Sequence, residues 1–167
     1  MSSFHIVDEI AGSQAIDENS TTQKHPLGTI VRATDTATTA YGSGEFIYLQ
    51  GLASTAVGEW VTYNADDWST TLLAANAIGP VALAMSACVA SEYGWYQISG
   101  KGVGLVAASF ADNANCYATA TAGTADDAVV AGDLIKNCKG ASAIDTPATG
   151  QAEIELNRPF MDDGLTA

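Results

Sequence analysis

Residues 94–107 read GWYQISGKGVGLVA, and the interpretation of this stretch decides the fold. Gly100, Gly102 and Gly104 alternate with single residues after an aromatic run that favours a β-strand. Because Gly102, Gly104 and Ala107 match a permissive dinucleotide pattern, the stretch could be a phosphate-binding turn. It could also be a strand that bends, because alternate glycines leave one face without side chains and let another segment come close.

The residues that follow the glycines favour the bent strand. A dinucleotide-binding turn leads into a helix whose N-terminus faces the pyrophosphate and which crosses back to a parallel strand. Residues 105–123, LVAASFADNANCYATATAG, hold at most a turn or two of helical periodicity before the pattern becomes period two. The Walker pattern also fails, since Gly102 follows Lys101 where Ser or Thr is needed. We therefore predict a strand corner at residues 100–104 and no nucleotide cofactor.

From residue 29 onward the chain is a succession of short segments typical of β-strands. They are rich in β-branched and aromatic residues and are bounded by Gly, Asn, Asp or Pro. The segments are residues 29–34, 45–50, 59–64, 79–87, 95–99, 115–123 and 152–157. In the last of them, Ile154 and Leu156 alternate with glutamates, as in a sheet with one solvent-facing side, and residues 64–67 read as a hairpin loop. The sequence thus predicts an all-β protein, folded as a compact β-barrel or β-sandwich.

The first 28 residues differ from this β-rich body. Residues 12–25, GSQAIDENSTTQKH, are polar and have no period, and Pro26 and Gly28 follow them. We predict an extended N-terminal arm over residues 1–28 and a β-rich domain over residues 29–167. Ordering a polar arm costs entropy, so its apolar tip is expected to pack on a neighbouring subunit or another protein. The candidate interface residues of this tip are Phe4, Ile6, Val7 and Ile10.

The composition limits the possible partners. The 167 residues correspond to one domain and carry a formal net charge of -13 at pH 7. Affinity for nucleic acid depends on Lys and Arg displacing counterions from phosphates, so we predict no nucleic-acid partner. No stretch is long and apolar enough to span a bilayer, and Asp8 and Glu9 interrupt what would be a secretory leader. We predict a soluble protein without a membrane partner, made in a reducing cytoplasm.

No pattern of catalytic or metal-binding residues stands out. Both histidines, His5 and His25, lie in the predicted arm, which leaves the body without a base for a serine or cysteine nucleophile. Three pairs of adjacent aspartates could act as glycosidase acids or calcium ligands, but all lie in predicted turns, where Asp bonds to nearby backbone amides; they are Asp66-Asp67, Asp126-Asp127 and Asp162-Asp163. The odd set of cysteines, Cys88, Cys116 and Cys138, contains no C-x-x-C pair, which indicates free thiols. We predict no enzymatic activity, no metal and no cofactor.

The three tryptophans could form a stacking platform for sugars or contacts at a protein interface. Trp60 and Trp95 lie inside strand patterns and are expected in the core. Trp68 follows the Asp66-Asp67 turn and is the best candidate for exposure, so we add it to the candidate interface residues.

Two stretches, GPVALAMSACVASEYGWYQISGKGVGLV (79–106) and DDAVVAGDLIKNCKGASAI (126–144), carry a resemblance to known proteins. The chain resembles the small head decoration, or capsid cement, proteins of tailed bacteriophages over roughly residues 29–160. In that family a Gly-Pro-Val-Ala strand precedes a hydrophobic strand and then a glycine-marked strand such as Gly102-Val103-Gly104. The long polar N-terminal arm departs from the family pattern.

The resemblance implies a non-enzymatic virion structural protein. Such a protein assembles in the host cytoplasm, binds the outer capsid surface, usually as a homotrimer, and ties neighbouring major capsid subunits together. A carbohydrate-binding β module of a virion spike or tail is the alternative from another class. It requires at least two tryptophans on one open face.

Overall fold

The computed structural model describes residues 4–8 and 13–162, which form strands, turns and loops and contain no helix. The prediction of an all-β protein is confirmed. In the described part of the chain the strands are β1 (Phe4–Ile6), β2 (Asn19–Ser20), β3 (Ile30–Asp35), β4 (Ser43–Gln50), β5 (Trp60–Tyr63), β6 (Thr70–Leu72), β7 (Ile78–Ala84), β8 (Tyr93–Leu105), β9 (Asn115–Ala118), β10 (Ala125–Asp126), β11 (Leu134–Gly140) and β12 (Gln151–Asp162).

Each of the seven segments predicted as strands overlaps a strand of the structure. The predicted hairpin is also confirmed, because β5 pairs with β6 in antiparallel register, with Tyr63 opposite Thr70. Sequence reasoning missed the two-residue and three-residue strands β1, β2 and β10. It also did not identify β11. In this strand the exposed Lys136, Asn137 and Lys139 interrupt the apolar pattern around the buried Ile135.

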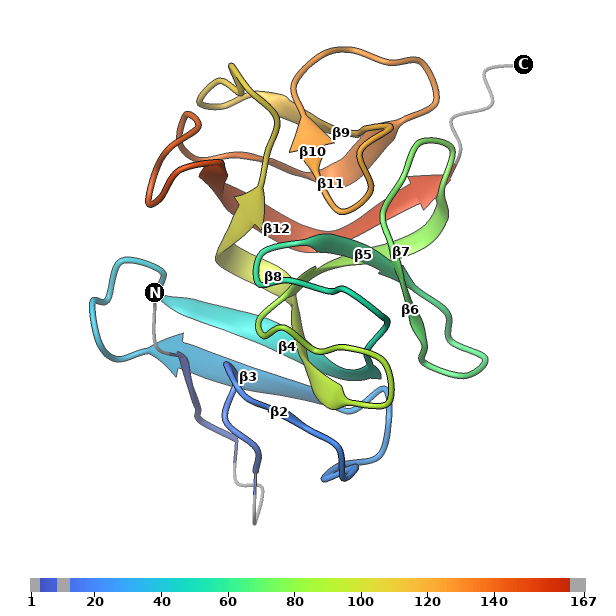
Figure 1. The fold of residues 1–167 in the computed structure, drawn as a ribbon. Coiled ribbons are helices and arrows are strands. Elements are labelled where there is room, and N and C mark those ends of the chain that lie inside the picture. The colour runs from blue at the N-terminus through green and yellow to red at the C-terminus, as the bar shows by residue number, and fades with distance from the viewer. Residues whose placement is uncertain (1–3, 9–12, 163–167) are drawn as a thin grey trace.

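The strands form one antiparallel sheet that curls around several packed cores (Figure 1). The strand order is β1-β3-β4-β8-β7-β12-β11-β9-β10, with β2 paired to β8 and β6 joined through β5 to β7. This path ends at β1 on one side and at β10 on the other, so the sheet is not closed into a barrel. The β-barrel alternative was therefore wrong.

The glycine-rich stretch lies in β8, which links the two halves of the sheet. Its first half pairs with β4 and its second half, residues 99–105, pairs with β12. Gly100 lies between them with a φ of +94°, a conformation that glycine adopts without strain. A Cβ at Gly102 would lie 2.4 Å from Gln97 Oε1, and one at Gly104 would lie 2.9 Å from Trp60 Nε1. The predicted strand corner is confirmed, and Gly102 and Gly104 are buried, where a phosphate could not reach them.

Buried side chains form three clusters. The N-terminal cluster contains Phe4, Ile16, Val31, Ala33, Phe46, Tyr48 and Trp95. The middle cluster contains Ile47, Leu49, Val61, Ala82, Ala84, Cys88, Tyr96 and Ile98. The C-terminal cluster contains Trp60, Leu73, Val81, Leu83, Val106, Phe110, Cys116, Ala118, Ala125, Ile135, Ala152, Ile154, Leu156 and Met161. Strand β7 thus contributes Val81 and Leu83 to the C-terminal cluster and Ala82 and Ala84 to the middle cluster, so both faces are covered over residues 81–84.

The prediction of an arm that extends away from the domain requires a correction. Residues 13–28 lie across the N-terminal cluster, where Ile16 is buried. Trp95 Nε1 donates to Gln14 O at 3.0 Å, and Tyr48 Oη donates to Gln14 Oε1 at 2.9 Å. These bonds satisfy two polar groups of the core that would otherwise be buried without partners. The prediction failed because hydrogen bonds from buried side chains, and not only apolar contacts, can hold a polar segment against the domain.

His25 makes the stability of the protein depend on pH in a way that can be measured. Its imidazole is buried beside Tyr48 and Trp95, and Nε2 accepts a hydrogen bond from Gln14 N at 3.2 Å, so the ring is neutral. Burial lowers the pKa of His25 below its ordinary value of 6.5. Protonation therefore favours the unfolded chain, and stability is lost as the pH falls below about 6.5.

We expect the urea midpoint to decrease between pH 7.5 and pH 5. Uptake of this one proton should lower the free energy of unfolding by at most about 1.4 kcal/mol per pH unit. The variant His25→Gln should be less stable at pH 7.5 but should lose less between the two pH values. Asp35 and Asp67 do not contribute to this change, because hydrogen bonds lower their pKa below 3.8. Equal pH slopes for the wild type and the variant would contradict the prediction.

Candidate functional site

The predicted interface residues do not form one surface. Phe4 is buried in the N-terminal cluster, and Ile6 is half-buried against the same cluster. Val7 is exposed, while Ile10 lies outside the described residues. Trp68 is half-buried and packs on the middle cluster. The structure thus uses Phe4 within its own domain, so Phe4 is not available for the intermolecular role that the sequence suggested.

The tryptophans follow the predicted order of exposure. Trp60 and Trp95 are fully buried, as predicted, and Trp68 is the most exposed of the three. A Cβ added at Gly28 would lie 2.6 Å from the Trp68 ring, so even this indole is partly covered by the backbone. The described residues therefore contain no open face with two tryptophans, which is the arrangement that a sugar-stacking platform needs.

Members of two acidic pairs, Asp67 and Asp127, accept hydrogen bonds from backbone amides. Asp67 Oδ1 accepts hydrogen bonds from Ser69 N at 3.0 Å and Ser69 Oγ at 2.7 Å, and these bonds lower the pKa of Asp67. Asp127 Oδ2 accepts a bond from Ala111 N at 2.9 Å. Within residues 4–8 and 13–162, no group of three His, Cys, Asp or Glu side chains is placed to hold a metal ion.

The thiols of Cys88 and Cys138 are not activated for nucleophilic chemistry. Burial raises the pKa of Cys88. The neighbouring Cys116 thiol and burial raise the pKa of Cys138 well above its ordinary value. A nucleophilic cysteine needs the opposite shift, since the thiolate is the reactive form.

An exposed apolar face covers three adjacent strands, β7, β12 and β11. It consists of Ile78, Pro80, Leu134 and Phe160, and we call it the apolar face. Phe160 lies opposite Pro80 across the β12–β7 pair and opposite Lys136 across the β11–β12 pair. Among the described residues, Ile78, the first residue of β7, is 68% exposed, and Phe160, near the end of β12, is 40% exposed. Side chains of this size on a bare sheet face are typical of an interaction surface.

A bulge in β12 brings Phe160 to this surface. Ile154 and Leu156 point into the core, and strict alternation would direct residue 160 inward as well. Arg158 instead has a φ of +52°, and the register with β11 shifts at this point, so that Met161 is buried and Phe160 is exposed. Arg158 also pairs with Glu45 at 3.0 Å. Sequence reasoning missed Phe160 because the period of two changes its phase within the strand.

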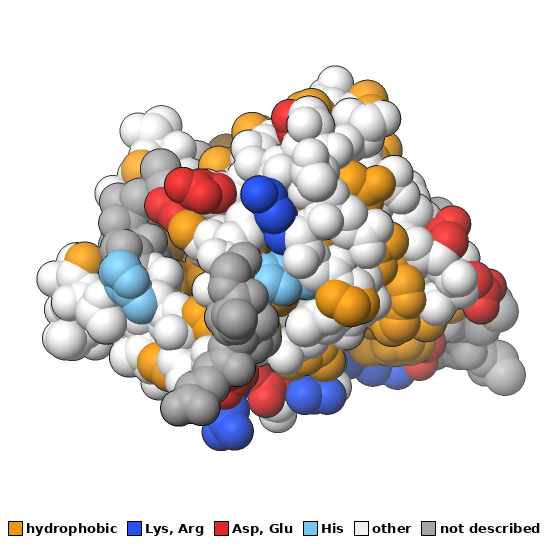
Figure 2. All heavy atoms as spheres, turned by 90° about the horizontal axis from the view of Figure 1, so that it is seen from below, with side chains coloured by type: hydrophobic (Ala, Val, Ile, Leu, Met, Phe, Trp, Pro, Cys, Tyr) orange, Lys and Arg blue, Asp and Glu red, His pale blue; other side chains and the backbone are white. Residues whose placement is uncertain are grey.

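Two charged side chains lie within the apolar face, since Asp162 is opposite Ile78 and Lys136 is opposite Phe160. Lys136 and Asp162 form an ion pair beside Phe160 and Ile78. The loop that leads into β11 carries two other exposed valines, Val129 and Val130. In the view from below, Lys and Arg side chains lie in separate places and form no continuous basic surface (Figure 2).

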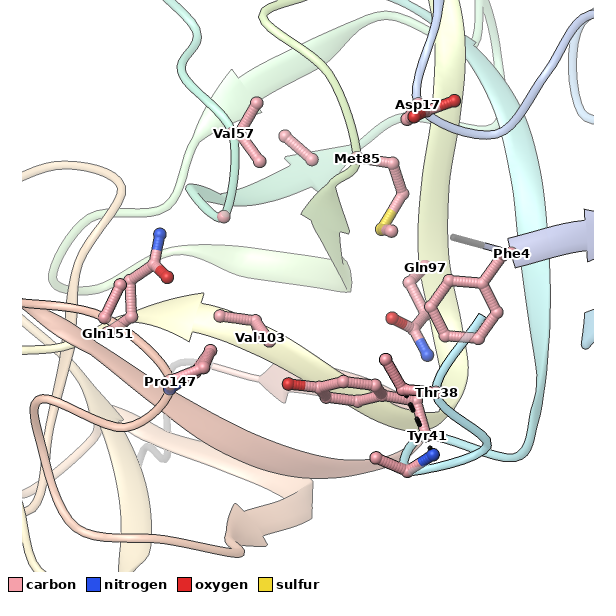
Figure 3. Close-up of a pocket in the computed structure, with 14 residues that line it drawn as sticks. Phe4, Asp17, Thr38, Tyr41, Val57, Met85, Gln97, Val103, Pro147 and Gln151 are labelled. Atoms are coloured by element: carbon pink, nitrogen blue, oxygen red, sulfur yellow. Dashed lines mark hydrogen bonds between the residues drawn. The ribbon is translucent and has the colours of Figure 1, made fainter. Parts of the chain in front are cut away.

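A pocket of about 540 Å³ lies over β8, between the loops that precede β4, β5 and β12. Its wall is mainly apolar and includes Phe4, Val57, Met85, Val103 and Pro147 (Figure 3). The volume is within the range of small-molecule sites, about 300–1,000 Å³. No sequence pattern indicated this pocket, because its walls come from segments that are far apart in the chain.

Polar contacts hold the loop that carries Tyr41, one of the residues in the pocket wall. Asp35 accepts hydrogen bonds from Ala37 N, Thr38 N and Thr38 Oγ1, which hold the loop that carries Tyr41, and these bonds lower the pKa of Asp35. Lys101 Nζ lies 5.3 Å from the centre of the Tyr41 ring. Burial and the Glu153 carboxylate raise the pKa of Tyr41, so its hydroxyl stays protonated.

Comparisons with known proteins give no assignment. No protein-family model matches the chain, and neither a curated protein nor a solved structure is significantly similar to it. A search of the described residues for a helix that could cross a membrane found none. Any statement about function therefore depends on the chain and its geometry.

Proposed function

We propose that this protein is a non-enzymatic virion structural protein, a decoration or cement protein that binds the outer surface of a bacteriophage capsid. In this proposal the β domain, folded as a compact sandwich of strand layers, contacts the major capsid protein and stabilises contacts between neighbouring capsid subunits. It self-associates as a homotrimer.

The apolar face carries the proposal. An exposed surface that contains Ile78 and Phe160 favours a protein partner, because burying large apolar side chains stabilises association. The Lys136-Asp162 ion pair, which lies beside Phe160 and Ile78, can orient the partner protein more than it adds to the binding affinity. The resemblance of residues 79–106 and 126–144 to head decoration proteins supports a capsid as that partner.

The net charge agrees with an exterior position. A formal charge of -13 keeps a protein soluble and repels nucleic acid, which lies inside the shell and not on its outer surface. The alternative, a carbohydrate-binding module of a spike or tail, required two tryptophans on one open face. Trp60 and Trp95 are fully buried, so no observation favours that alternative.

Binding to capsid shells tests the proposal. Head shells of the phage whose genome encodes the chain, prepared without this protein, are mixed with purified protein and sedimented. We expect saturable binding, and we expect Ile78→Glu and Phe160→Glu to weaken it by about tenfold or more, since truncating or charging a central contact commonly costs more than about 1 kcal/mol.

Val89→Glu is the matched control. Like Ile78, Val89 is an exposed β-branched apolar residue. It lies in the loop after β7, at the opposite end of that strand from Ile78. Its binding is expected to equal that of the wild type. Sedimentation equilibrium of the protein alone is expected to give the mass of a trimer. If the wild type does not sediment with the shells, or if the control weakens binding as much as Ile78→Glu, the proposal is wrong.

A further inference from the structure

We propose that the pocket over β8 binds a neutral, mainly apolar small molecule that donates one hydrogen bond, from a hydroxyl or an N–H group, to Gln97. This site is separate from the apolar face of β7, β11 and β12, so the inference goes beyond attachment to a capsid.

Gln97 is the observation that points to a ligand. Its side chain is fully buried, and Oε1 has no hydrogen-bond partner among the residues that the structure describes. The amide lies in the pocket wall together with Met85, Val103 and Tyr41, and its Oε1 atom also lies close to Gly102 (Figure 3). A buried acceptor without a partner is unfavourable, so a donor that reaches it from the pocket gains the full benefit of that bond.

The orientation of this amide is determined by its neighbours. Nε2 donates to Ser99 O and to Lys101 O, both at 3.1 Å. Turning the amide over would place Oε1 against two carbonyl oxygens, so Oε1 has to be the atom that faces away from them. The pocket therefore presents an acceptor, and the matching ligand group is a donor.

The rest of the wall selects an apolar, neutral body for the ligand. Phe4, Val57, Val103 and Pro147 line the space with apolar atoms, and Met85 adds a flexible thioether that adapts to different shapes. Asp17, which is exposed, is the one residue charged at neutral pH among the described lining residues. An anionic ligand would be repelled by it and by the net charge of the chain.

A matched pair of ligands tests the hydrogen bond. The donor ligand is 2-naphthol, and 2-methylnaphthalene has nearly the same shape without a donor. Binding is followed in the full chain by NMR of methyl-labelled methionine. Met85 lines the pocket, while Met161 is buried in the C-terminal cluster and serves as the internal control. We expect 2-naphthol to shift the Met85 signal saturably, to leave Met161 unchanged, and to bind at least about tenfold more tightly than 2-methylnaphthalene.

Two variants separate the roles of the amide and the cavity. Val103→Trp fills the pocket from a half-buried position and should weaken both ligands at least tenfold, whereas Val129→Trp, at an exposed loop residue outside the pocket, should leave both unchanged. Gln97→Met keeps the length of the side chain without the acceptor, so the two ligands should bind equally; if this variant does not fold, Val103→Trp and the ligand pair decide. Equal affinity of the wild type for both ligands, or no Met85 shift at the solubility limit, would overturn the proposal.

Discussion

Deleting residues 2–24 is expected to prevent the β domain from folding. The deletion removes Phe4 and Ile16 from the N-terminal cluster and leaves Tyr48 and Trp95, both fully buried in the intact protein, exposed on that side of the sheet. Each buried apolar side chain of this size contributes about 1.5–3 kcal/mol. The loss should therefore approach about 5 kcal/mol, which is as large as the entire stability of many domains.

Polar contacts add to this loss. Trp95 Nε1 and Tyr48 Oη donate to Gln14, so the deletion leaves two core donors without their partners. The β1–β3 and β2–β8 pairs are removed as well, which exposes backbone groups of β3 and β8. We expect the truncated chain to lack the near-UV circular dichroism of the intact protein and to show no cooperative urea transition.

Single substitutions in the same segment provide the control. Ile16→Ala should lower the free energy of unfolding by about 2–4 kcal/mol, because Ile16 is buried, whereas Glu18→Ala, at an exposed side chain, should change it by less than about 0.5 kcal/mol. A truncated chain that unfolds cooperatively at the urea midpoint of the intact protein would show that the segment is an independent arm after all.

Trp60→Ala is expected to lower the free energy of unfolding by about 3–5 kcal/mol. Trp60 is fully buried in the C-terminal cluster and packs against Gly104, where a Cβ would lie only 2.9 Å from its Nε1 atom. The same nitrogen donates to Leu105 O at 2.9 Å, so the indole joins β5 to the end of β8. The substitution removes this bond and leaves a cavity under the glycine-rich stretch.

Trp68→Ala is the matched comparison for Trp60→Ala. Trp68 is half-buried and packs at the border of the middle cluster, so its replacement should lower the free energy of unfolding by less than about 2 kcal/mol. Urea unfolding followed by far-UV circular dichroism measures both variants. Equal losses for the two variants would mean that Trp60 does not have the central role that its burial indicates.

Local sequence patterns were sufficient to predict most of the strands. Alternation of apolar and polar residues located β12, alternation of bulky and small residues located β7, and turn residues located the β5–β6 hairpin. The glycines at positions 102 and 104 were assigned to a bent strand because no helix pattern follows them, and the structure confirms this. The burial of Trp60 and Trp95 was also predictable, since both lie inside strand patterns.

The surfaces that matter for function were not predictable in the same way. Phe160 continues a strand in which Ile154 and Leu156 face inward, and only the bulge at Arg158 turns it to the outside. Gln97 lies in an aromatic strand, and nothing in its neighbourhood along the chain indicates that its Oε1 atom remains without a partner among the described residues.

The sequence by itself determined that this protein is built from β-strands, where most of those strands lie, and that its glycine-rich stretch is a strand. Only the tertiary structure decided that the N-terminal segment belongs to the core, that Phe160 is exposed, and that a pocket forms over β8. The physical reason is that periodicity reports the conformation of neighbouring residues, whereas burial depends on segments that meet in space. Gln14 and Trp95 illustrate this, because their hydrogen bond joins residues 81 positions apart.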